Sequence, residues 1–247
     1  YGSDSLGGTI QVRTLDPREG RLHGDLQLFG ASADVSGGAN AVLSGGTPRV
    51  GWLLGGSARR VNDLRAGGGT DSRHAFRRFF GLSDPMIREL TGDRAQDSAF
   101  SQSGAHSKIL VRPTERDIFS AFYQFSSLDG VRNYKDLLGG LGRLRSDVAP
   151  QQLHFLYGRY ERFQLGWLDS VSGTFSWNAQ TDGSLRQGLR FSDPITKDIS
   201  RVDSYGLAVQ ATEAAGRHHF LSFGGDWFRE LIASRRTLIR DASSVPQ

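Results

Sequence analysis

Residues 170–180 read Ser-Val-Ser-Gly-Thr-Phe-Ser-Trp-Asn-Ala-Gln, and polar and apolar side chains alternate through the whole stretch. Every even position is Ser, Thr, Asn or Gln, whereas the odd positions carry Val171, Gly173, Phe175, Trp177 and Ala179. Successive side chains of a β-strand point to opposite faces, so a period of two is typical of a strand with one apolar and one polar face. The stretch therefore predicts such a strand.

The same alternation recurs along the chain. It is clear at residues 119–126, 204–212 and 221–228, and weaker around residues 26–30, 50–56 and 153–157. The pattern predicts nine strands, which are longer than the roughly 5–6 residues usual in soluble sheets. Their expected bounds are 22–35, 37–46, 49–62, 102–112, 117–127, 151–161, 168–181, 203–214 and 218–230.

The connections between these strands alternate in length. The short ones are residues 45–49, 113–117, 165–169 and 214–218, and the longer ones are residues 63–102, 128–149, 183–202 and the tail from Ile232. Short turns at one end and long loops at the other are typical of outer-membrane barrels. The sequence thus predicts an all-β fold, an antiparallel transmembrane β-barrel segment. A soluble sandwich alternates in the same way, so periodicity alone leaves both open.

Composition excludes several classes of protein. The 247 residues include 32 Gly, one Met and no Cys, which excludes a disulfide scaffold and thiolate sites. The chain has no run of about 18 apolar residues, so no transmembrane helix is expected. The 30 Lys and Arg are scattered and nearly matched by 26 Asp and Glu, for a net charge of +4, so no nucleic-acid partner is expected. Because the chain opens on Tyr1, a processed chain or a fragment is expected.

The first residues, 1–14, read Tyr-Gly-Ser-Asp-Ser-Leu-Gly-Gly-Thr-Ile-Gln-Val-Arg-Thr. Paired glycines permit positive φ and close backbone approach at a turn, and Ile10 and Val12 alternate as in a short strand. The stretch resembles the closing segment of the plug domain in TonB-dependent outer-membrane receptors. The positions that match the family's turn are Tyr1, Gly2, Gly7 and Gly8.

This resemblance implies that residues 1–16 end a plug domain and that residues 17–247 begin the barrel. About nine strands of a roughly 22-stranded barrel would be present, preceded by the last plug strand. The family sits in the bacterial outer membrane and imports scarce nutrients, here a ferric siderophore or haem, with energy delivered by TonB. The TonB-binding region would lie upstream of this chain. Neither catalysis nor a cofactor is implied.

Arginines and aromatic residues mark the long loops as candidate ligand-binding segments. Together they suit anionic, planar ligands such as ferric catecholates or haem propionates. The candidate capture residues are Arg73, His74, Arg77 and Arg78 in the first long loop, and Arg132 and Tyr134 in the second. The same charges suit lipopolysaccharide phosphates, so an anionic metal chelate and lipopolysaccharide are both expected partners. Residues 84–90 predict one helical turn with Ser83 or Asp84 as its cap.

The sequence gives little support to an enzyme or a metal site. It has no Gly-x-Ser-x-Gly, no phosphate-binding loop and no zinc-type spacing. Asp226 and Glu230 alternate onto a polar face, where we expect them to meet arginines. Aromatic residues near expected strand ends predict the girdles of a membrane barrel, or else the core of a sandwich. They are Trp52, Trp167, Trp227 and Tyr157.

Two rival functions remain at this point. A passive porin or adhesin barrel would show the same strands, but the plug-like motif at residues 1–14 disfavours it. A soluble secreted β-sandwich, acting as an enzyme or a binding module, would show the same alternation. The sandwich differs from both barrels in what covers the apolar face of the sheet, a second sheet in place of lipid.

Overall fold

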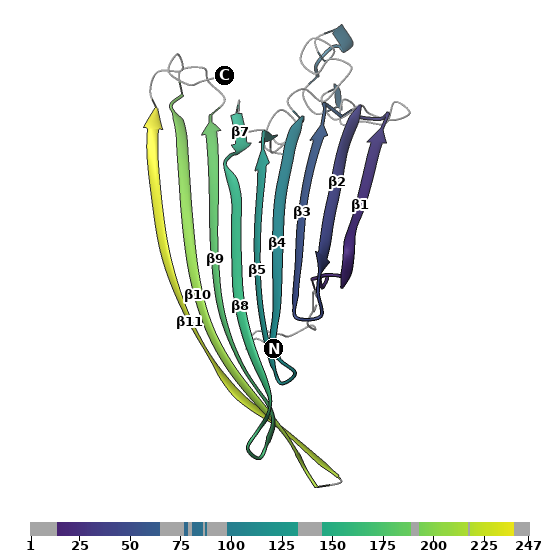
Figure 1. Cartoon of the computed structure of the whole chain (residues 1–247). Helices are drawn as coiled ribbons and strands as arrows, with labels where there is room; N and C mark the ends of the chain where they lie inside the picture. The colour runs from purple at the N-terminus through teal and green to yellow at the C-terminus, as the bar shows by residue number, and fades with distance from the viewer. Residues whose placement is uncertain are drawn as a thin grey trace.

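The computed structural model describes residues 14–64, 77–78, 81–85, 87, 98–132, 145–188, 193–216 and 218–239. Most of these residues form β-strands (Figure 1). The long strands are β1 (Gly20–Ala31), β2 (Ser36–Gly46), β3 (Val50–Val61), β4 (Phe100–Thr114), β5 (Asp117–Asp129), β8 (Gln151–Leu165), β9 (Leu168–Gln187), β10 (Ile195–Ala215) and β11 (His219–Ile239).

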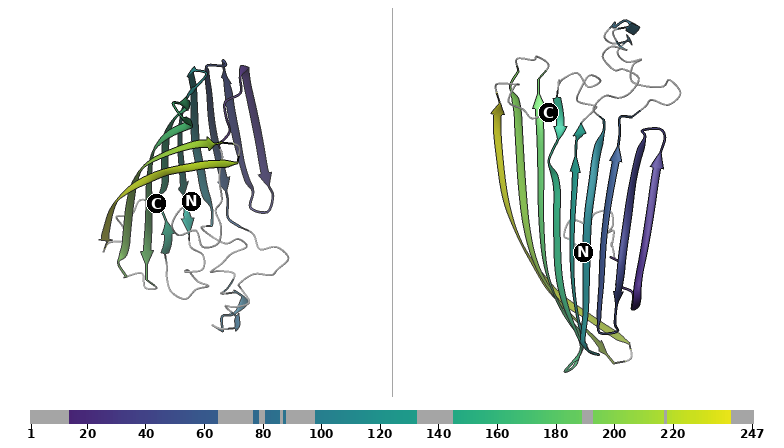
Figure 2. Two further views of the ribbon diagram at one scale, coloured as in Figure 1. Left: turned by 90° about the horizontal axis from the view of Figure 1, so that it is seen from below. Right: turned by 45° about the horizontal axis from the view of Figure 1, so that its top comes forward.

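The strands form one antiparallel sheet in the order β1-β2-β3-β4-β5-β8-β9-β10-β11. Two short strands, β6 (Val131–Arg132) and β7 (Arg145–Val148), pair with each other, and β7 also pairs with β9. Figure 2 shows that the sheet is curved and twisted. The all-β, antiparallel fold is therefore confirmed. Within the described part of the chain the sheet is open, with β1 and β11 as its edges.

All nine expected strands are present, and three of them, β9, β10 and β11, are longer than expected by six residues or more. β9 runs to Gln187 and β10 begins at Ile195, so most of the expected loop at 183–202 is strand. β11 continues to Ile239, through the first part of the expected tail. Asp198 lies opposite Arg236 in the β10–β11 ladder. Cross-strand polar pairs of this kind stabilise a ladder where the apolar alternation has already ended.

The four short connections are turns, as expected, and they lie at one end of the sheet, which we call the turn end (Figure 1). The opposite end is the loop end. Leu165 pairs with Leu168, so Gly166 and Trp167 form a two-residue hairpin turn. Gly166 has a φ of 64°, in the left-handed region that such turns require.

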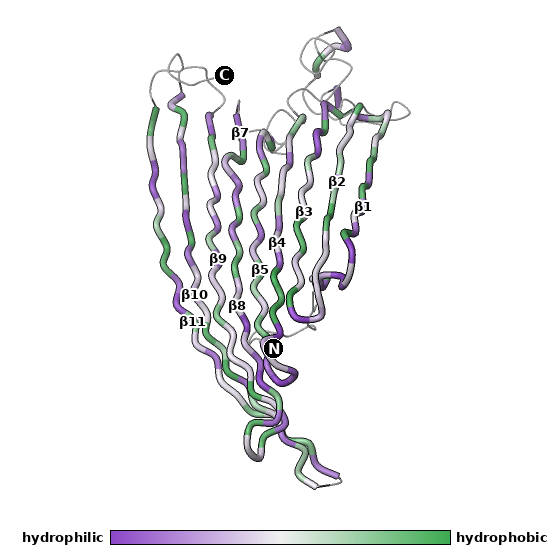
Figure 3. Tube along the Cα trace, viewed as in Figure 1, coloured by the Kyte–Doolittle hydropathy of each residue, from purple (hydrophilic) through white to green (hydrophobic). Residues whose placement is uncertain are grey.

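The strand register sorts side chains onto two faces. Residues directly opposite each other in an antiparallel pair project to the same face. Phe175 lies opposite Leu207, and Leu207 lies opposite Trp227. We call this side the apolar face; in the other direction the same row continues through Gly158, Ala121, Ile109 and Trp52. The polar face carries Ser172, Thr174 and Ser176, and the alternation is visible along the strands in Figure 3.

Exposure is inverted relative to a water-soluble sheet. On the apolar face Leu28 is 73% exposed, Leu207 51% and Trp227 53%. On the polar face Lys108 is only 6% exposed and Ser172 7%. A soluble antiparallel sheet usually packs its apolar face on a core and leaves its polar face to water. Here all the described strands belong to one sheet, so no second sheet covers the apolar face in the described part.

One expected row of side chains lies on the other face. Leu153, Phe155 and Tyr157 pair with Gln180, Asn178 and Ser176, which places them on the polar face. The apolar face of β8 receives His154, Leu156, Gly158 and Tyr160 instead. Large side chains occur in both rows of β8, so its own alternation is weak. The neighbouring strands β5 and β9 therefore decide which row faces which side. Tyr157 is accordingly not part of an aromatic girdle on the apolar face.

Candidate functional site

The polar face carries a hollow of about 710 Å³ over β4, β5, β8 and β9. Residues of the segment that precedes β1 form one side of it. The lining residues are Thr14, Asp16, Lys108, Ser120, Phe122, Gln124, Phe155, Tyr157, Arg159, Thr174 and Ser176.

Three aromatic rings form an apolar patch within this hollow. The ring centroids of Phe122 and Tyr157 are 5.5 Å apart and stacked, and those of Phe155 and Tyr157 are 6.0 Å apart. The Phe122–Phe155 distance is 6.3 Å. Aromatic pairs at such distances attract each other beyond the area that they bury. The polar face thus offers a mixed surface, with aromatic rings in the middle and hydroxyl, amide and cationic groups around them.

The segment before β1 lies against this face through ion pairs. The Lys108 Nζ atom donates to Asp16 Oδ1 at 2.6 Å and to Thr14 Oγ1 at 3.0 Å. Thr14 Oγ1 lies 3.4 Å from the Tyr157 hydroxyl. Nearer the turn end, Arg112 Nη1 donates to Glu19 Oε1 at 3.2 Å. Residues 14–19 therefore contact the polar face at two places.

The burial of the Lys108 side chain makes the first of these contacts important. That side chain is 7% exposed, whereas Asp16 is 73% exposed. A nearly buried ammonium needs a counter-charge, and within the described residues its anionic partner is Asp16. Because Asp16 itself is largely solvated, we expect the pair to contribute about 1–3 kcal/mol to the free energy of unfolding, less than a pair with both charges buried.

Sequence reasoning did not single out this hollow. Lys108 is the one charged residue between His106 and Arg112 in β4, and it falls at a polar position of the alternation. That signal marks a lysine facing the polar side. It could not reveal the partner, because Asp16 lies 92 residues away in the sequence.

The acidic residues of β11 lie near the open edge of the sheet. Asp226 and Glu230 lie on the polar face, opposite Ala208 and Ser204. Glu230 Oε1 accepts a hydrogen bond from Ser204 Oγ at 3.2 Å. No ion pair links either carboxylate to an arginine among the described residues, so the expected pairing with arginines of a complete barrel stays a prediction.

The candidate capture residues that the structure describes have partners in this chain. Arg77 Nε donates to Asp84 Oδ1 at 2.8 Å, and both side chains are exposed. Arg132 Nε donates to Asp147 Oδ1 at 2.6 Å. Because Arg132 is in β6 and Asp147 is in β7, this pair joins the two strands. Asp147 also accepts a hydrogen bond from Arg145, a residue of β7. Arg78 is helical and exposed.

The remaining candidates, Arg73, His74 and Tyr134, and the motif residues Tyr1, Gly2, Gly7 and Gly8, lie outside the described residues. The expected helical turn is present where it is described. Asp84, Pro85 and Ile87 are helical, and the Ile87 amide donates to the Ser83 carbonyl at 3.0 Å.

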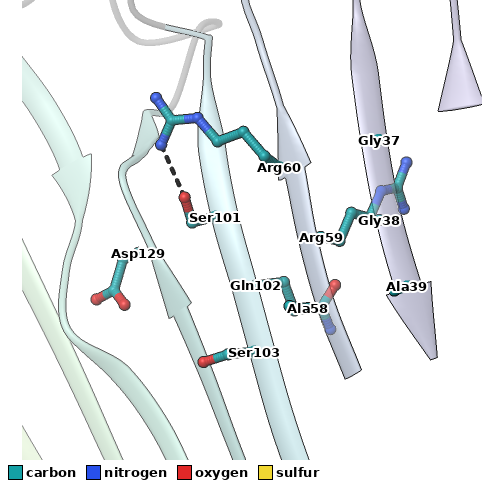
Figure 4. A pocket seen from close by; sticks show the side chains of 10 residues that line it. All are labelled: Gly37, Gly38, Ala39, Ala58, Arg59, Arg60, Ser101, Gln102, Ser103 and Asp129. Carbon is teal, nitrogen blue, oxygen red and sulfur yellow. Dashed lines mark hydrogen bonds between the residues drawn. The ribbon is translucent and has the colours of Figure 1, made fainter. Parts of the chain in front are cut away.

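A second hollow, of about 490 Å³, lies where β2, β3, β4 and β5 reach the loop end (Figure 4). Arg60 Nη1 donates to Ser101 Oγ at 2.7 Å (Figure 4). The Arg59 guanidinium lies 5.7 Å from the centroid of the Phe29 ring, within cation–π range. Both arginines thus contact neighbours in this chain. The lining residues are Gly37, Gly38, Ala39, Ala58, Arg59, Arg60, Ser101, Gln102, Ser103 and Asp129.

No cluster of three or more His, Cys, Asp or Glu residues suited to a metal ion occurs in the described ranges. Among the same residues, no helix is both long and apolar enough to cross a membrane. A search of family models, curated proteins and solved structures found no match to this chain.

Proposed function

We propose that this chain forms part of the wall of an outer-membrane β-barrel. The observation that carries the proposal is a band of apolar side chains on the apolar face, with polar residues on both sides of it. In three strands the bounding residues are ten positions apart and enclose four residues on that face. They are Asp203 and Glu213 on β10, Asp117 and Ser127 on β5, and His219 and Arg229 on β11.

The height of the band suits a membrane. A strand rises roughly 3.3 Å per residue, and membrane strands are tilted by roughly 45°. Ten residues then span about 23 Å along the membrane normal, close to the apolar band of about 25 Å in outer-membrane barrels. A soluble β-sandwich would have to cover the same band with a second sheet. The described strands form a single sheet, which favours lipid as the covering phase.

We further propose that the barrel belongs to a TonB-dependent receptor. The resemblance of residues 1–14 to the end of a plug domain supports this assignment. The contacts of residues 14–19 with the polar face support it independently, because that face would line the lumen. In this proposal residues 1–16 end the plug and residues 17–247 begin the barrel. The receptor would import a scarce nutrient, a ferric siderophore or haem, and TonB would supply the energy.

Ligand capture by the loop arginines would require an exchange of partners. Arg77 is paired with Asp84, and Arg132 is paired with Asp147. An anionic chelate would have to displace one of these carboxylates or bind to other groups of the loops. Asp147, which is 11% exposed at its side chain, would be the harder of the two to displace.

Cysteine labelling tests the barrel assignment, and the chain suits the method because it contains no native cysteine. Phe175→Cys should react with a lipid-soluble maleimide in the inserted full-length protein, and Thr174→Cys with a water-soluble one. Equal reaction of both positions with the water-soluble reagent would reject a membrane wall. A heat-modifiable band in SDS gels and extraction only by detergent would separate the barrel from a soluble sandwich.

Topology and energy dependence test the receptor assignment. An epitope inserted near Gly68 should be detected on intact cells, and one at Thr114 should not. The reverse result would invert the orientation. Ligand uptake should cease when TonB is removed, whereas a passive porin would continue to conduct its solutes.

A further inference from the structure

The loop-end half of β10 and β11 carries basic side chains on the same side as the apolar band. Lys197 lies opposite Thr237, Arg235 opposite Ile199, and Arg229 opposite Tyr205. These register positions place all three cations on the apolar face. Arg229 and Arg235 are exposed, and Lys197 is half-buried. No ion pair within the described part of the chain involves any of the three.

Lys197 and Arg235 are close enough to repel each other. Arg235 is opposite Ile199, so Lys197 and Arg201 are its two diagonal neighbours on β10. Diagonal neighbours lie about 7–8 Å apart, within reach of long side chains. Asp203 neutralises Arg201 through contacts of 2.7 Å and 3.0 Å. Lys197 and Arg235 then remain as two adjacent like charges, an arrangement that is unfavourable without an anion. Arg229 lies six residues farther along β11, with Asp203 as one of its diagonal neighbours.

The opposite face of the same strand ends has the reverse balance. There Asp182, Asp198 and Glu230 outnumber Arg186 and Arg236, and Asp198 forms an ion pair with Arg236 at 2.6 Å. The excess of positive charge is therefore specific to one face. A general need for solubility would not segregate charge in this way.

Apolar residues separate these cations and continue into the band. Ile199 and Leu231 lie on the same face between them, and Leu231 is exposed. Toward the turn end, the row of Tyr205, Leu207 and Val209 begins directly beside Arg229. A ligand on this surface would meet cations at one end and a continuous apolar surface at the other. That combination suits an amphiphile with an anionic head.

We propose that this surface, Lys197, Arg229 and Arg235 with Ile199 and Leu231, binds the phosphorylated headgroup of a membrane lipid. The inference rests on the proposed membrane function, because it requires lipid tails against the apolar band. Basic side chains at a membrane surface are attracted to anionic headgroups, and their aliphatic stems pack on the neighbouring apolar surface. A compact anion such as inorganic phosphate would neutralise the cations but would leave the neighbouring apolar side chains uncovered.

The test measures binding of diphosphoryl lipid A by the full-length protein in zwitterionic detergent micelles. The double variant Lys197→Gln with Arg235→Gln is compared with Arg186→Gln with Arg236→Gln, which removes the same charge from the polar face of the same strand ends. The first variant should lose about tenfold or more in affinity, and salt should weaken the binding of the unmodified chain. The second variant should bind as the unmodified chain does.

Three outcomes would overturn the proposal. Equal losses in the two double variants would show a general charge effect. Equal affinity for dephosphorylated lipid A would show that the cations are not used. Full competition by inorganic phosphate at matched ionic strength would assign the site to a free anion. A heat-modifiable band, measured first on each variant, keeps these outcomes separate from a failure of membrane insertion itself.

Discussion

The two faces of this sheet are built from the same strands but differ in their surroundings. On the polar face, Lys108 is almost buried and paired with Asp16, and the rings of Phe122 and Tyr157 stack. On the apolar face, Leu207 and Trp227 are each about half exposed, and nothing in the described chain covers them. The polar face is therefore contacted by another segment of the chain, the residues before β1, whereas no described segment packs over the apolar face. This difference between the faces is the basis for proposing lipid as the phase that covers the apolar face.

The largest expected effect comes from a charge in the middle of the apolar band. Phe175 lies midway between Asp169 and Thr181 on β9 and is 42% exposed. Phe175→Arg should destabilise the membrane-inserted protein by about 2–4 kcal/mol, the cost of an arginine on the lipid face near the bilayer midplane. Thr174→Arg, at the same height on the polar face, should cost far less. Denaturant titration of both variants in lipid vesicles measures the difference.

The same two variants also test whether the two faces have different surroundings. In a soluble protein with an open sheet, an arginine at position 175 would be solvated and nearly neutral in effect. Equal free energies of unfolding for the two variants would then show that both faces meet water. A larger loss for Thr174→Arg would invert the assignment of the faces.

A smaller effect is expected where the segment before β1 contacts the polar face. Asp16→Asn would leave the Lys108 ammonium nearly buried, with the Thr14 hydroxyl as its remaining partner among the described contacts. We expect a loss of about 1–3 kcal/mol in the free energy of unfolding. Asp25→Asn is the matched control, because the Arg18–Asp25 pair is 4.0 Å long and exposed on both sides. It should change stability by less than about 0.5 kcal/mol.

Limited proteolysis shows whether the loss at Asp16 is local. If residues 14–19 leave the polar face in Asp16→Asn, cleavage in this segment should become faster while β4 and β5 stay protected. Unchanged proteolysis together with unchanged stability would mean that Lys108 finds another partner, and that the polar face does not depend on this contact.

The sequence predicts which face a side chain occupies only where the strand itself has one polar and one apolar row. Where both rows contain large apolar residues, it does not. In residues 170–180 every second side chain is polar, so the sequence predicts both the strand and its two sides, and the register agrees. In β8 both rows contain large apolar residues, and only the pairing with β5 and β9 places Phe155 and Tyr157 on the polar face. The hollow beside them depends on that placement and on a contact between Lys108 and Asp16. Long-range contacts of this kind leave no local pattern in a sequence.

The extents of the strands were less predictable for a related reason. Apolar alternation in β10 and β11 fades toward the loop end, where Lys197, Asp198, Arg235 and Arg236 occur. A pattern of apolar residues cannot distinguish a polar strand from a loop. The ladder continues because charges on facing strands pair, as Asp198 and Arg236 do.

The smallest effect is expected at the turn between β1 and β2, which belongs to neither face. A hydrogen bond there shows how much a water-exposed contact contributes to local stability. The Asp34 carboxylate accepts a hydrogen bond from the Ser36 amide at 3.1 Å. Hydrogen bonding to Ser36, mainly through its side chain, lowers the pKa of Asp34, and the positive charge of Arg59 adds to this effect. A lowered pKa in the folded state favours the ionised form. Its stabilising contribution is therefore present above the unfolded value of about 3.9 and is lost as the pH falls through the folded value.

Amide exchange of Ser36 measures this contribution directly. Corrected for the intrinsic pH dependence of exchange, its protection should be constant above about pH 5 and should fall below about pH 4, as Asp34 becomes protonated. In Asp34→Asn the side-chain amide oxygen can still accept the hydrogen bond, so protection should persist but lose this pH dependence. A pH-dependent fall that survives in Asp34→Asn would assign it to another group. The same fall at Thr174 or Phe175 would mean that acid opens the sheet itself, and the turn would then not serve as a local baseline for the two faces.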